Sequence, residues 1–235
     1  MMKIIYVTDV HGDTATYESL FKMAMDKSIK AVFIGGDTCP GFNSIIQKKF
    51  LSSYMIPRLR KFSKKAKKPV YIIMGNDDLA ANKGIYEKAD KEGLCHFVSG
   101  KEAKLGNYTV TGYTFINPTP FILKDWEKGE EEIKKDMERL AVRVKGRKLI
   151  CLFHAPPFGT HLDVLHDGSH VGSIAIAEFI KNAGPCMTFH GHIHESPMMS
   201  GVIAEKLGET LSINPGSRVI MAIDIDKADE IEILG

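Results

Sequence analysis

The sequence predicts an α/β protein in which two mixed sheets stack on each other and are flanked by helices. The first third of the chain alternates short apolar runs with amphipathic segments, which is typical of parallel strands joined by right-handed helical crossovers. The last third alternates short strand-like runs with turns, which favours antiparallel pairing. Parallel units at the start and antiparallel strands at the end together fit two stacked sheets with helices outside.

The first third is expected to fold as β-α-β-α-β. Its apolar runs predict buried strands at Lys3–Thr8, Ala31–Gly35 and Val70–Met74. Apolar residues at helical spacing predict two intervening helices, Thr14–Asp26 and the longer Asn43–Lys65. Pro57 falls inside the second helix and should kink it or divide it in two, because proline has no amide hydrogen to donate.

The middle of the chain is less regular and is expected to begin a second sheet. A helix is expected within Leu79–Glu92. Three short strand candidates follow it, at His96–Val98, Glu102–Leu105 and Tyr108–Tyr113. Gly106 and Asn107 suit a two-residue hairpin turn between the last two strands. We expect a loop at Ile116–Ile122 because this segment contains two prolines.

The remainder of the chain returns to regular elements. Helices are predicted at Asp125–Val144 and Gly172–Asn182, and buried strands at Leu149–Phe153 and Met187–Phe189. Four further strands are predicted at Gly201–Glu205, Thr210–Ile213, Val219–Ile225 and Glu230–Leu234. No internal repeat, linker or low-complexity tract interrupts the sequence, so we expect a single domain that spans residues 1–235.

Composition is that of an ordinary soluble globular protein. The chain has 235 residues, of which 44% are hydrophobic and 26% charged, enough for one full hydrophobic core. The formal net charge of +2 exerts no strong pull, so we expect neither nucleic acid nor membrane as a partner. Four widely spaced cysteines argue against a disulfide framework and fit a cytoplasmic location. We recognise no signal peptide and no apolar run long enough to span a bilayer.

Five of the apolar runs end in residues that bind metal ions. In chain order they lead into Asp9 and His11, Asp37, Asn76, His154, and the pair His192 and His194. Open α/β sheets bind ligands beyond the carboxyl ends of their strands, so we expect these side chains to meet at one sheet edge. So many oxygen and nitrogen ligands exceed the needs of one tetrahedral ion and suit two divalent ions. Asp37 is the candidate bridge, since a carboxylate has two oxygens.

Two ions of this kind would act on phosphate esters. Ions about 3.5–4 Å apart can deprotonate a shared water, and the resulting bridging hydroxide attacks phosphorus while the ions neutralise the phosphate oxygens. Oxygen and imidazole ligands together suit manganese, which is our first expectation, and also iron, zinc, nickel or cobalt.

The same residues carry a resemblance to a known family. Read in order, the motifs resemble those of the calcineurin-like metallophosphoesterases: Asp9-Val10-His11, Gly36-Asp37, Gly75-Asn76-Asp77-Asp78, His154-Ala155-Pro156, Gly191-His192-Ile193-His194 and Asn214-Pro215-Gly216-Ser217. The resemblance implies a four-layer α/β/β/α sandwich that hydrolyses phosphomonoesters or phosphodiesters. It also implies two ligand sets that share one carboxylate. Asp9, His11, Asp37 and His194 would hold one ion, and Asp37, Asn76, His154 and His192 would hold the other.

One departure from the family pattern falls at Asp77. The family usually has a histidine at this position, which contacts the phosphate and is thought to help the leaving group depart. Asp77 would replace it only if protonated, whereas a free aspartic acid has a pKa of about 3.9. Burial or a neighbouring negative charge would raise that pKa, and a nearby cation pair would lower it. We name Asp77 as a catalytic candidate and expect slow turnover or a substrate with a good leaving group.

A second catalytic candidate is His170, in the polar segment 159–173 that follows the His154 motif. In one interpretation this segment is a substrate-binding loop beside the metals, because catalytic loops gather at this edge of the sheet. In the other it is a surface loop that ends where Ser173 caps a helix. Only the first interpretation predicts that removing the His170 imidazole changes the kinetics.

Three functions compete for this sequence. The leading one is a cytoplasmic dinuclear phosphohydrolase that acts on a small phosphomonoester or on a phosphodiester, including a cyclic nucleotide. The runner-up is a non-catalytic scaffold on the same fold, although buried carboxylates are costly to keep without cations. The third is a nuclease, but no additional DNA-binding domain follows the core, and the basic run Arg58–Lys68 is better explained as a solvated helix end. The sequence gives no signal from which to predict the oligomeric state.

Overall fold

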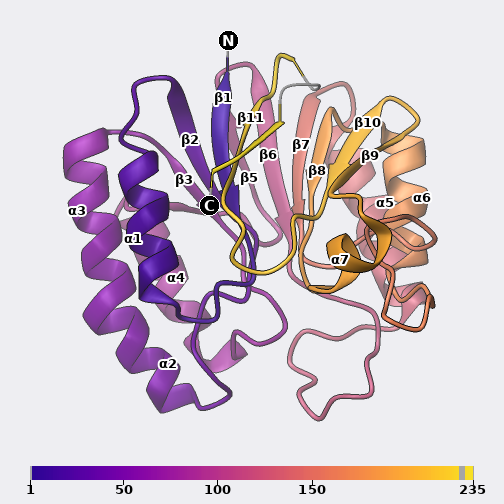
Figure 1. Cartoon of the computed structure of the whole chain (residues 1–235), viewed down its shortest axis with the longest axis horizontal. Helices are drawn as coiled ribbons and strands as arrows, with labels where there is room; N and C mark the ends of the chain where they lie inside the picture. Colours follow the sequence, from indigo (N-terminus) through magenta and orange to yellow (C-terminus); the bar gives the residue numbers. More distant parts are fainter. Residues whose placement is uncertain (1, 228–230, 235) are drawn as a thin grey trace.

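The computed structural model describes residues 2–227 and 231–234. It has four layers in the order helices, sheet, sheet, helices, and the two sheets pack face to face in the centre (Figure 1). Within the described residues each sheet has six strands, in the orders β12-β11-β1-β2-β3-β4 and β5-β6-β7-β8-β10-β9. Both sheets mix parallel and antiparallel pairs, so the predicted α/β/β/α sandwich of two mixed sheets is confirmed.

The first sheet has a parallel centre and an antiparallel edge. Its strands are β1 (Lys3–Val7), β2 (Ile29–Ile34), β3 (Val70–Ile72), β4 (His96–Phe97), β11 (Met221–Asp224) and β12 (Ile231–Ile233). Strands β1 to β4 are parallel, and β11 pairs with β1 in antiparallel orientation. The prediction of a second-sheet strand at His96–Val98 is therefore wrong, because this segment extends the first sheet beside β3. Glu230, where the last predicted strand begins, lies outside the described residues.

The second sheet also has a parallel centre. Its strands are β5 (Glu102–Leu105), β6 (Tyr108–Tyr113), β7 (Lys148–Phe153), β8 (Met187–Phe189), β9 (Ala204–Leu207) and β10 (Thr210–Ile213). Strands β6, β7, β8 and β10 are parallel, and β5 and β9 add antiparallel edges. Leu105 pairs with Tyr108, so Gly106 and Asn107 form the predicted two-residue turn. Strand β9 begins at Ala204 rather than at the predicted Gly201, because a short unpredicted helix ends just before it.

Helices cover both outer faces of the sandwich. The first sheet is covered by α1 (Thr14–Met23), α2 (Ser44–Phe50), α3 (Ile56–Ala66) and α4 (Lys83–Lys91), the second by α5 (Glu130–Val144) and α6 (Ile174–Ala183). The short helix α7 (Ser196–Ser200) and the 3₁₀ turn Ala80–Asn82 complete the set. Asp13 and Asn43 cap α1 and α2, since each side chain accepts hydrogen bonds from two first-turn amides. Among the described residues, no helix combines the length and apolar character needed to cross a membrane.

The long helix is divided near Pro57, as the sequence predicted. A π-helical turn, Leu51–Met55, separates α2 from α3, and Pro57 lies in the first turn of α3. Proline donates no hydrogen bond, so the α-helical pattern is interrupted one turn earlier and the Ile56 amide bonds to the Leu51 carbonyl instead.

Strand residues are buried on both sheet faces, and alternate residues serve different layers. Ile4 and Tyr6 of β1 pack between the two sheets, while Ile5 and Val7 pack against the helices of the first sheet. A third cluster lies between the second sheet and helices α5 and α6. Each fully buried side chain of this size contributes about 1.5–3 kcal/mol. This two-sided burial fixes the strands firmly and so fixes the positions of their carboxyl ends.

Helix α5 begins at Glu130, later than the predicted start at Asp125. The preceding residues run across the sheet edge instead: the Trp126 indole donates to the Asp78 carbonyl at 2.5 Å, and the Ile116 amide donates to the Trp126 carbonyl at 2.8 Å. Burying one large side chain therefore outweighs the helical preference of this charged stretch. It also brings the proline-rich loop after β6 close to the carboxyl ends of the strands.

Candidate metal centre

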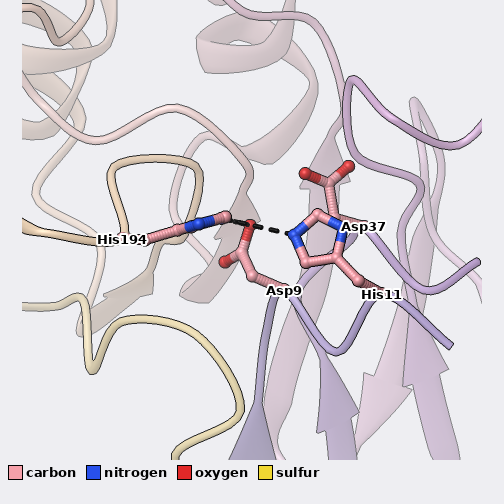
Figure 2. Close-up of side chains that lie close together, drawn as sticks. All are labelled: Asp9, His11, Asp37 and His194. Carbon is pink, nitrogen blue, oxygen red and sulfur yellow. Dashed lines mark hydrogen bonds and ion pairs between the residues drawn. The ribbon is translucent and has the colours of Figure 1, made fainter. Parts of the chain in front are cut away.

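The turn after β1 positions the first two candidate ligands. The Asp9 amide donates to the Gly36 carbonyl at 3.1 Å, and the His11 amide donates to the Asp37 carbonyl at 2.8 Å. These bonds continue the parallel pairing of β1 and β2 past the ends of both strands. Asp9, His11 and Asp37 consequently reach the same edge of the sheet (Figure 2).

Strained backbone accompanies the candidate ligands. Asp9, His11, Asp37 and His192 have φ values of 52°, 48°, 46° and 66°, in the left-handed region that non-glycine residues seldom occupy. Among the described residues, only two other non-glycine residues share this conformation, and both lie outside the candidate ligand set. Such strain costs about 1–3 kcal/mol per residue and concentrates at functional sites. The strain therefore marks these four side chains as positioned for a function rather than for stability.

Four candidate ligands converge closely. One ligand atom from each of Asp9, His11, Asp37 and His194 lies within 4.8 Å of the others. The His194 Nε2 atom is 3.0 Å from Asp9 Oδ1 and 3.4 Å from His11 Nε2. Figure 2 shows these side chains gathered from different strand ends. They are the residues that the family resemblance implies for the first ion.

The remaining three candidates form a second group beside Asp37. The His154 Nε2 atom is 3.0 Å from Asn76 Oδ1 and 3.3 Å from Asp37 Oδ2. The His192 ring centroid is 5.5 Å from that of His154, which places it beside the same group. The structure thus brings the seven predicted metal ligands to one edge, with Asp37 between the two groups.

Two glycines allow the carboxylates to sit this close. A Cβ atom on Gly75 would lie 2.2 Å from Asp37 Oδ1, and one on Gly191 would lie 2.2 Å from Asp9 Oδ2. No real Cβ approaches an oxygen so closely, so any side chain at either position would displace the carboxylate. The glycine that precedes the ligand in each of these motifs is therefore part of the site.

The buried carboxylates and imidazoles of the centre stabilise one another's charged forms. Burial alone would lower the pKa of His154, but the Asp37 and Asp9 carboxylates outweigh it and raise this pKa to about 10. Burial likewise opposes the ionised form of Asp9, but His194 and His154 hold the Asp9 pKa below its usual range. Bound cations would take over the role of the imidazole protons. Buried carboxylates, imidazoles and one amide oxygen are a donor set that fits divalent ions of the manganese-to-zinc series.

His190 lies behind this centre and is not one of its candidate ligands. It is fully buried, with Nδ1 2.8 Å from the Ala155 carbonyl and Nε2 2.7 Å from Thr188 Oγ1. Burial lowers its pKa to about 4, so the ring is neutral at physiological pH. Both ring nitrogens are occupied, and His190 supports the loop that carries the histidine motif.

Asp77 lies at the rim of the centre, beside the first group. Its Oδ2 atom is 3.6 Å from His11 Nδ1, and its Oδ1 atom accepts a hydrogen bond of 2.7 Å from the side-chain amide of Asn76. Burial and the neighbouring Asp37 carboxylate raise the pKa of Asp77 to about 7. Cations bound at Asp37 would neutralise that repulsion and lower the pKa again.

His170 is anchored by a buried carboxylate. Its Nδ1 atom donates to Asp163 Oδ1 at 2.7 Å, and the fully buried Asp163 also accepts bonds from the amides of Gly159, Thr160 and Gly172. The other ring nitrogen, Nε2, makes no hydrogen bond within the described part of the chain. His170 and the candidate ligand His192 line the same cavity, whose volume is about 620 Å³. The segment ends where Ser173 caps helix α6, as the second interpretation predicted, and the first interpretation stays a prediction.

Asp78 organises two ligand loops at once, a role that we did not predict. The side chain is fully buried and accepts bonds from the amides of Thr38, Cys39 and Gly75 at 2.9–3.0 Å. It therefore ties the turn after Asp37 to the turn that carries the third motif. Its position at the end of that motif is the signal that would have suggested this role.

Asn214 has a similar role on the other side of the centre. Its amide group donates to the carbonyls of Leu162 and Ile193 at 2.9 and 3.2 Å, and its Oδ1 atom accepts from the Gly216 amide. One buried side chain thus joins the histidine motif to the loop that holds Asp163. The motif Asn214-Pro215-Gly216-Ser217 gave a sequence signal, but only the structure shows what it holds.

Comparison with known proteins supports the resemblance seen in the sequence. The calcineurin-like phosphoesterase family model matches residues 2–196. A search of curated proteins returned no match. The protein TT1561 of Thermus thermophilus superimposes with a TM-score of 0.75 and 20% identity, over 99% of this chain and 98% of that one.

Two further solved structures share the fold at lower similarity. A dimetal phosphatase from Danio rerio matches with a TM-score of 0.58 and 9% identity, over 94% of this chain and 92% of its own. A putative 5'-nucleotidase from Staphylococcus aureus, in complex with alpha-ketoglutarate, matches with a TM-score of 0.55 and 15% identity, over 99% of this chain and 52% of its own. The family model covers most of the chain, and this protein therefore belongs to the calcineurin-like phosphoesterase family.

Proposed function

We propose that this protein hydrolyses small phosphate esters with two divalent cations, manganese being the first expectation and iron, zinc, nickel or cobalt the alternatives. One observation carries the proposal: seven oxygen and nitrogen donors meet at one sheet edge, with the Asp37 carboxylate between two groups. The names of two structural neighbours, a dimetal phosphatase and a putative 5'-nucleotidase, agree with this class of reaction. The chain is expected to act in the cytoplasm.

The ligands divide into two sets around Asp37. Asp9, His11 and His194 would join Asp37 around one ion, and Asn76, His154 and His192 would join it around the other. When bound, the ions would supply Lewis acidity toward the phosphate oxygens and lower the pKa of a water molecule. The strained backbone at the ligand positions and the room that Gly75 and Gly191 leave for the carboxylates set the geometry of the site before any ligand arrives.

We assign His170 as the first candidate for protonating the leaving group. Asp163 accepts the Nδ1 proton, which fixes the orientation of the ring and leaves Nε2 for a ligand in the cavity shared with His192. In general, an imidazole is a better proton donor at neutral pH than a carboxyl group that lies beside two cations. Asp77 is the second candidate, since burial favours its protonated form but cations at Asp37 oppose it.

The alternative of a non-catalytic scaffold is less well supported. Buried Asp9 and Asp37 without cations cost several kcal/mol in solvation, on the order expected for buried ions. A scaffold would gain nothing from this penalty or from the strained backbone at four ligand positions. A nuclease is also less well supported, because no lysine or arginine among the described residues lines the cavity beside His192.

The experiment is a metal-dependent ester assay. Protein stripped with EDTA and reloaded with manganese should release p-nitrophenol from p-nitrophenyl phosphate or from its bis-ester, and the stripped protein should not. Asp37→Asn serves as the matched inactive variant. Absence of release from wild-type protein that has bound two manganese ions per chain would favour the scaffold, and faster cleavage of single-stranded DNA would favour the nuclease.

A further inference from the structure

A cavity of about 620 Å³ opens beside the second group of candidate ligands. Its walls come mainly from three separate parts of the chain: residues 117–121 after β6, residues 158–174 around His170, and residues 192–195 in the histidine motif. His192 belongs both to this wall and to the candidate ligands. A phosphate held at the metal centre would therefore direct one of its ester groups into this cavity.

The cavity wall is largely apolar. Phe121, Phe158 and Ile174 line it, although 63%, 43% and 49% of the surface of these residues remains exposed. Leu165 and Ile193 add further apolar surface. Large apolar side chains that gather at a cavity beside reactive groups are typical of a site that buries an apolar part of a ligand.

The charge of the wall restricts the ligand further. Among the described residues that line the cavity, none is lysine or arginine, and Glu130 and Glu195 are its carboxylates. A second phosphate or a carboxylate on the substrate would meet no lysine or arginine here, only the imidazoles of His166, His170 and His192, and would face the two carboxylates. The ester group that enters the cavity should therefore carry no negative charge of its own.

Glu130 lines the cavity but is held by hydrogen bonds within the protein. Its Oε2 atom accepts bonds from the Ala175 amide at 2.8 Å and from Ser173 Oγ at 3.2 Å. Its Oε1 atom is buried and has no hydrogen-bond partner among the described residues. Buried acceptors without a partner are rare, but this atom exposes almost no surface and therefore offers no acceptor to a ligand in the cavity.

We propose that this cavity binds the leaving group of the substrate, and that this group is an uncharged, apolar ring system. The inference rests on the proposed function, because the metal centre defines which end of the ester enters the cavity. The apolar wall selects the ring, and the Glu130 and Glu195 carboxylates, with no lysine or arginine among the described lining residues, disfavour a second anionic group.

The test compares esters that differ only in the leaving group. Naphthyl phosphate and β-glycerophosphate are offered to the manganese-loaded protein, and kcat/KM is measured for each. We expect naphthyl phosphate to exceed β-glycerophosphate by at least about tenfold, the range typical of a filled apolar pocket. To separate this effect from leaving-group acidity, the same ratio is measured for Phe121→Ala.

Variants of the cavity wall test whether this ratio of kcat/KM values depends on the cavity. Phe121→Ala should lower kcat/KM for naphthyl phosphate by at least about threefold and leave β-glycerophosphate unchanged. Phe42→Ala is the matched control, because Phe42 is an exposed phenylalanine outside this cavity wall. An unchanged ratio in Phe121→Ala overturns the inference while the proposed function stands.

Binding provides a readout that does not depend on turnover. Calorimetry with naphthylmethylphosphonate and methylphosphonate, which the enzyme does not hydrolyse, should give tighter binding of the naphthyl compound to wild-type protein and not to Phe121→Ala. If no ester is hydrolysed, the proposed function fails, and the calorimetry still decides the inference. Equal affinity for the two phosphonates would overturn it.

Discussion

The metal edge and the cavity beside it are built in different ways. The candidate ligands follow directly on buried strands, and backbone bonds between neighbouring turns, such as His11 to Asp37, hold them in place. The cavity is instead built from loops, which side chains such as Asp163 and Trp126 hold together. Strand ends give a fixed set of ligands for the chemistry, and loops give a surface that can vary with the substrate.

The largest effect should come from the carboxylate between the two ligand groups. Asp37→Asn removes one charge from both groups, so we expect kcat to fall by on the order of a hundredfold or more and manganese content to fall below two per chain. Asp90→Asn is the control, since Asp90 lies near the end of α4 and pairs with Lys101 on the surface. Elemental analysis and ester hydrolysis measure both effects. Full activity in Asp37→Asn would contradict the assignment of the bridge.

A methyl group at Gly75 should disturb the same carboxylate without changing its charge. The new Cβ would lie 2.2 Å from Asp37 Oδ1, so Gly75→Ala should weaken metal binding by roughly tenfold or more and lower the free energy of unfolding by about 1–3 kcal/mol. Gly84→Ala is the matched control, because a Cβ there meets nothing and α4 gains roughly 0.5–1 kcal/mol. Denaturant titration and calorimetry with manganese give both quantities. Equal behaviour of the two variants would show that the glycine contact is unimportant.

Removing the His170 imidazole should affect the loop-built cavity rather than the metal edge. His170→Ala should slow esters with poor leaving groups by roughly a hundredfold and leave p-nitrophenyl phosphate nearly unchanged, because a good leaving group needs no proton. His161→Ala is the control, since this exposed histidine pairs with Glu205 outside the cavity. Unaltered KM and kcat on poor leaving groups would remove His170 from the mechanism.

The smallest effect is expected at Asp77, where this chain departs from the family pattern. Asp77→His restores a neutral donor beside the first ligand group and should raise kcat for phosphomonoesters by a few-fold, on the order expected for one additional hydrogen bond to phosphate. Metal content must stay at the wild-type level for the comparison to hold. A folded, metal-loaded Asp77→His protein with unchanged or lower kcat would count against a role for this position in catalysis.

The sequence predicted the strand ends well because neighbouring residues in the chain determine where a strand ends. A buried apolar run followed by glycine and a polar residue states where a strand ends, and parallel order then brings Asp9, Asp37 and Asn76 together. The hairpin turn at Gly106 and Asn107 was predictable for the same reason.

The loops were less predictable because distant contacts decide them. Trp126 delays the start of α5 by contacting Asp78, and this contact has no local signal in the sequence. The return of β11 to the edge of β1, and the burial of Asp163 beside His170, likewise depend on packing between segments of the chain that the sequence pattern does not connect. The cavity and the unpaired acceptor on Glu130 follow from these contacts, which explains why sequence analysis could not propose them.

The most direct test of this account is the metal content and position in protein loaded with manganese. Elemental analysis together with anomalous diffraction should give two ions per chain, about 3.5–4 Å apart, with Asp37 contacting both. Asp9, His11 and His194 should surround one ion, and Asn76, His154 and His192 the other. A single ion, or two ions that do not share Asp37, would contradict the central claim.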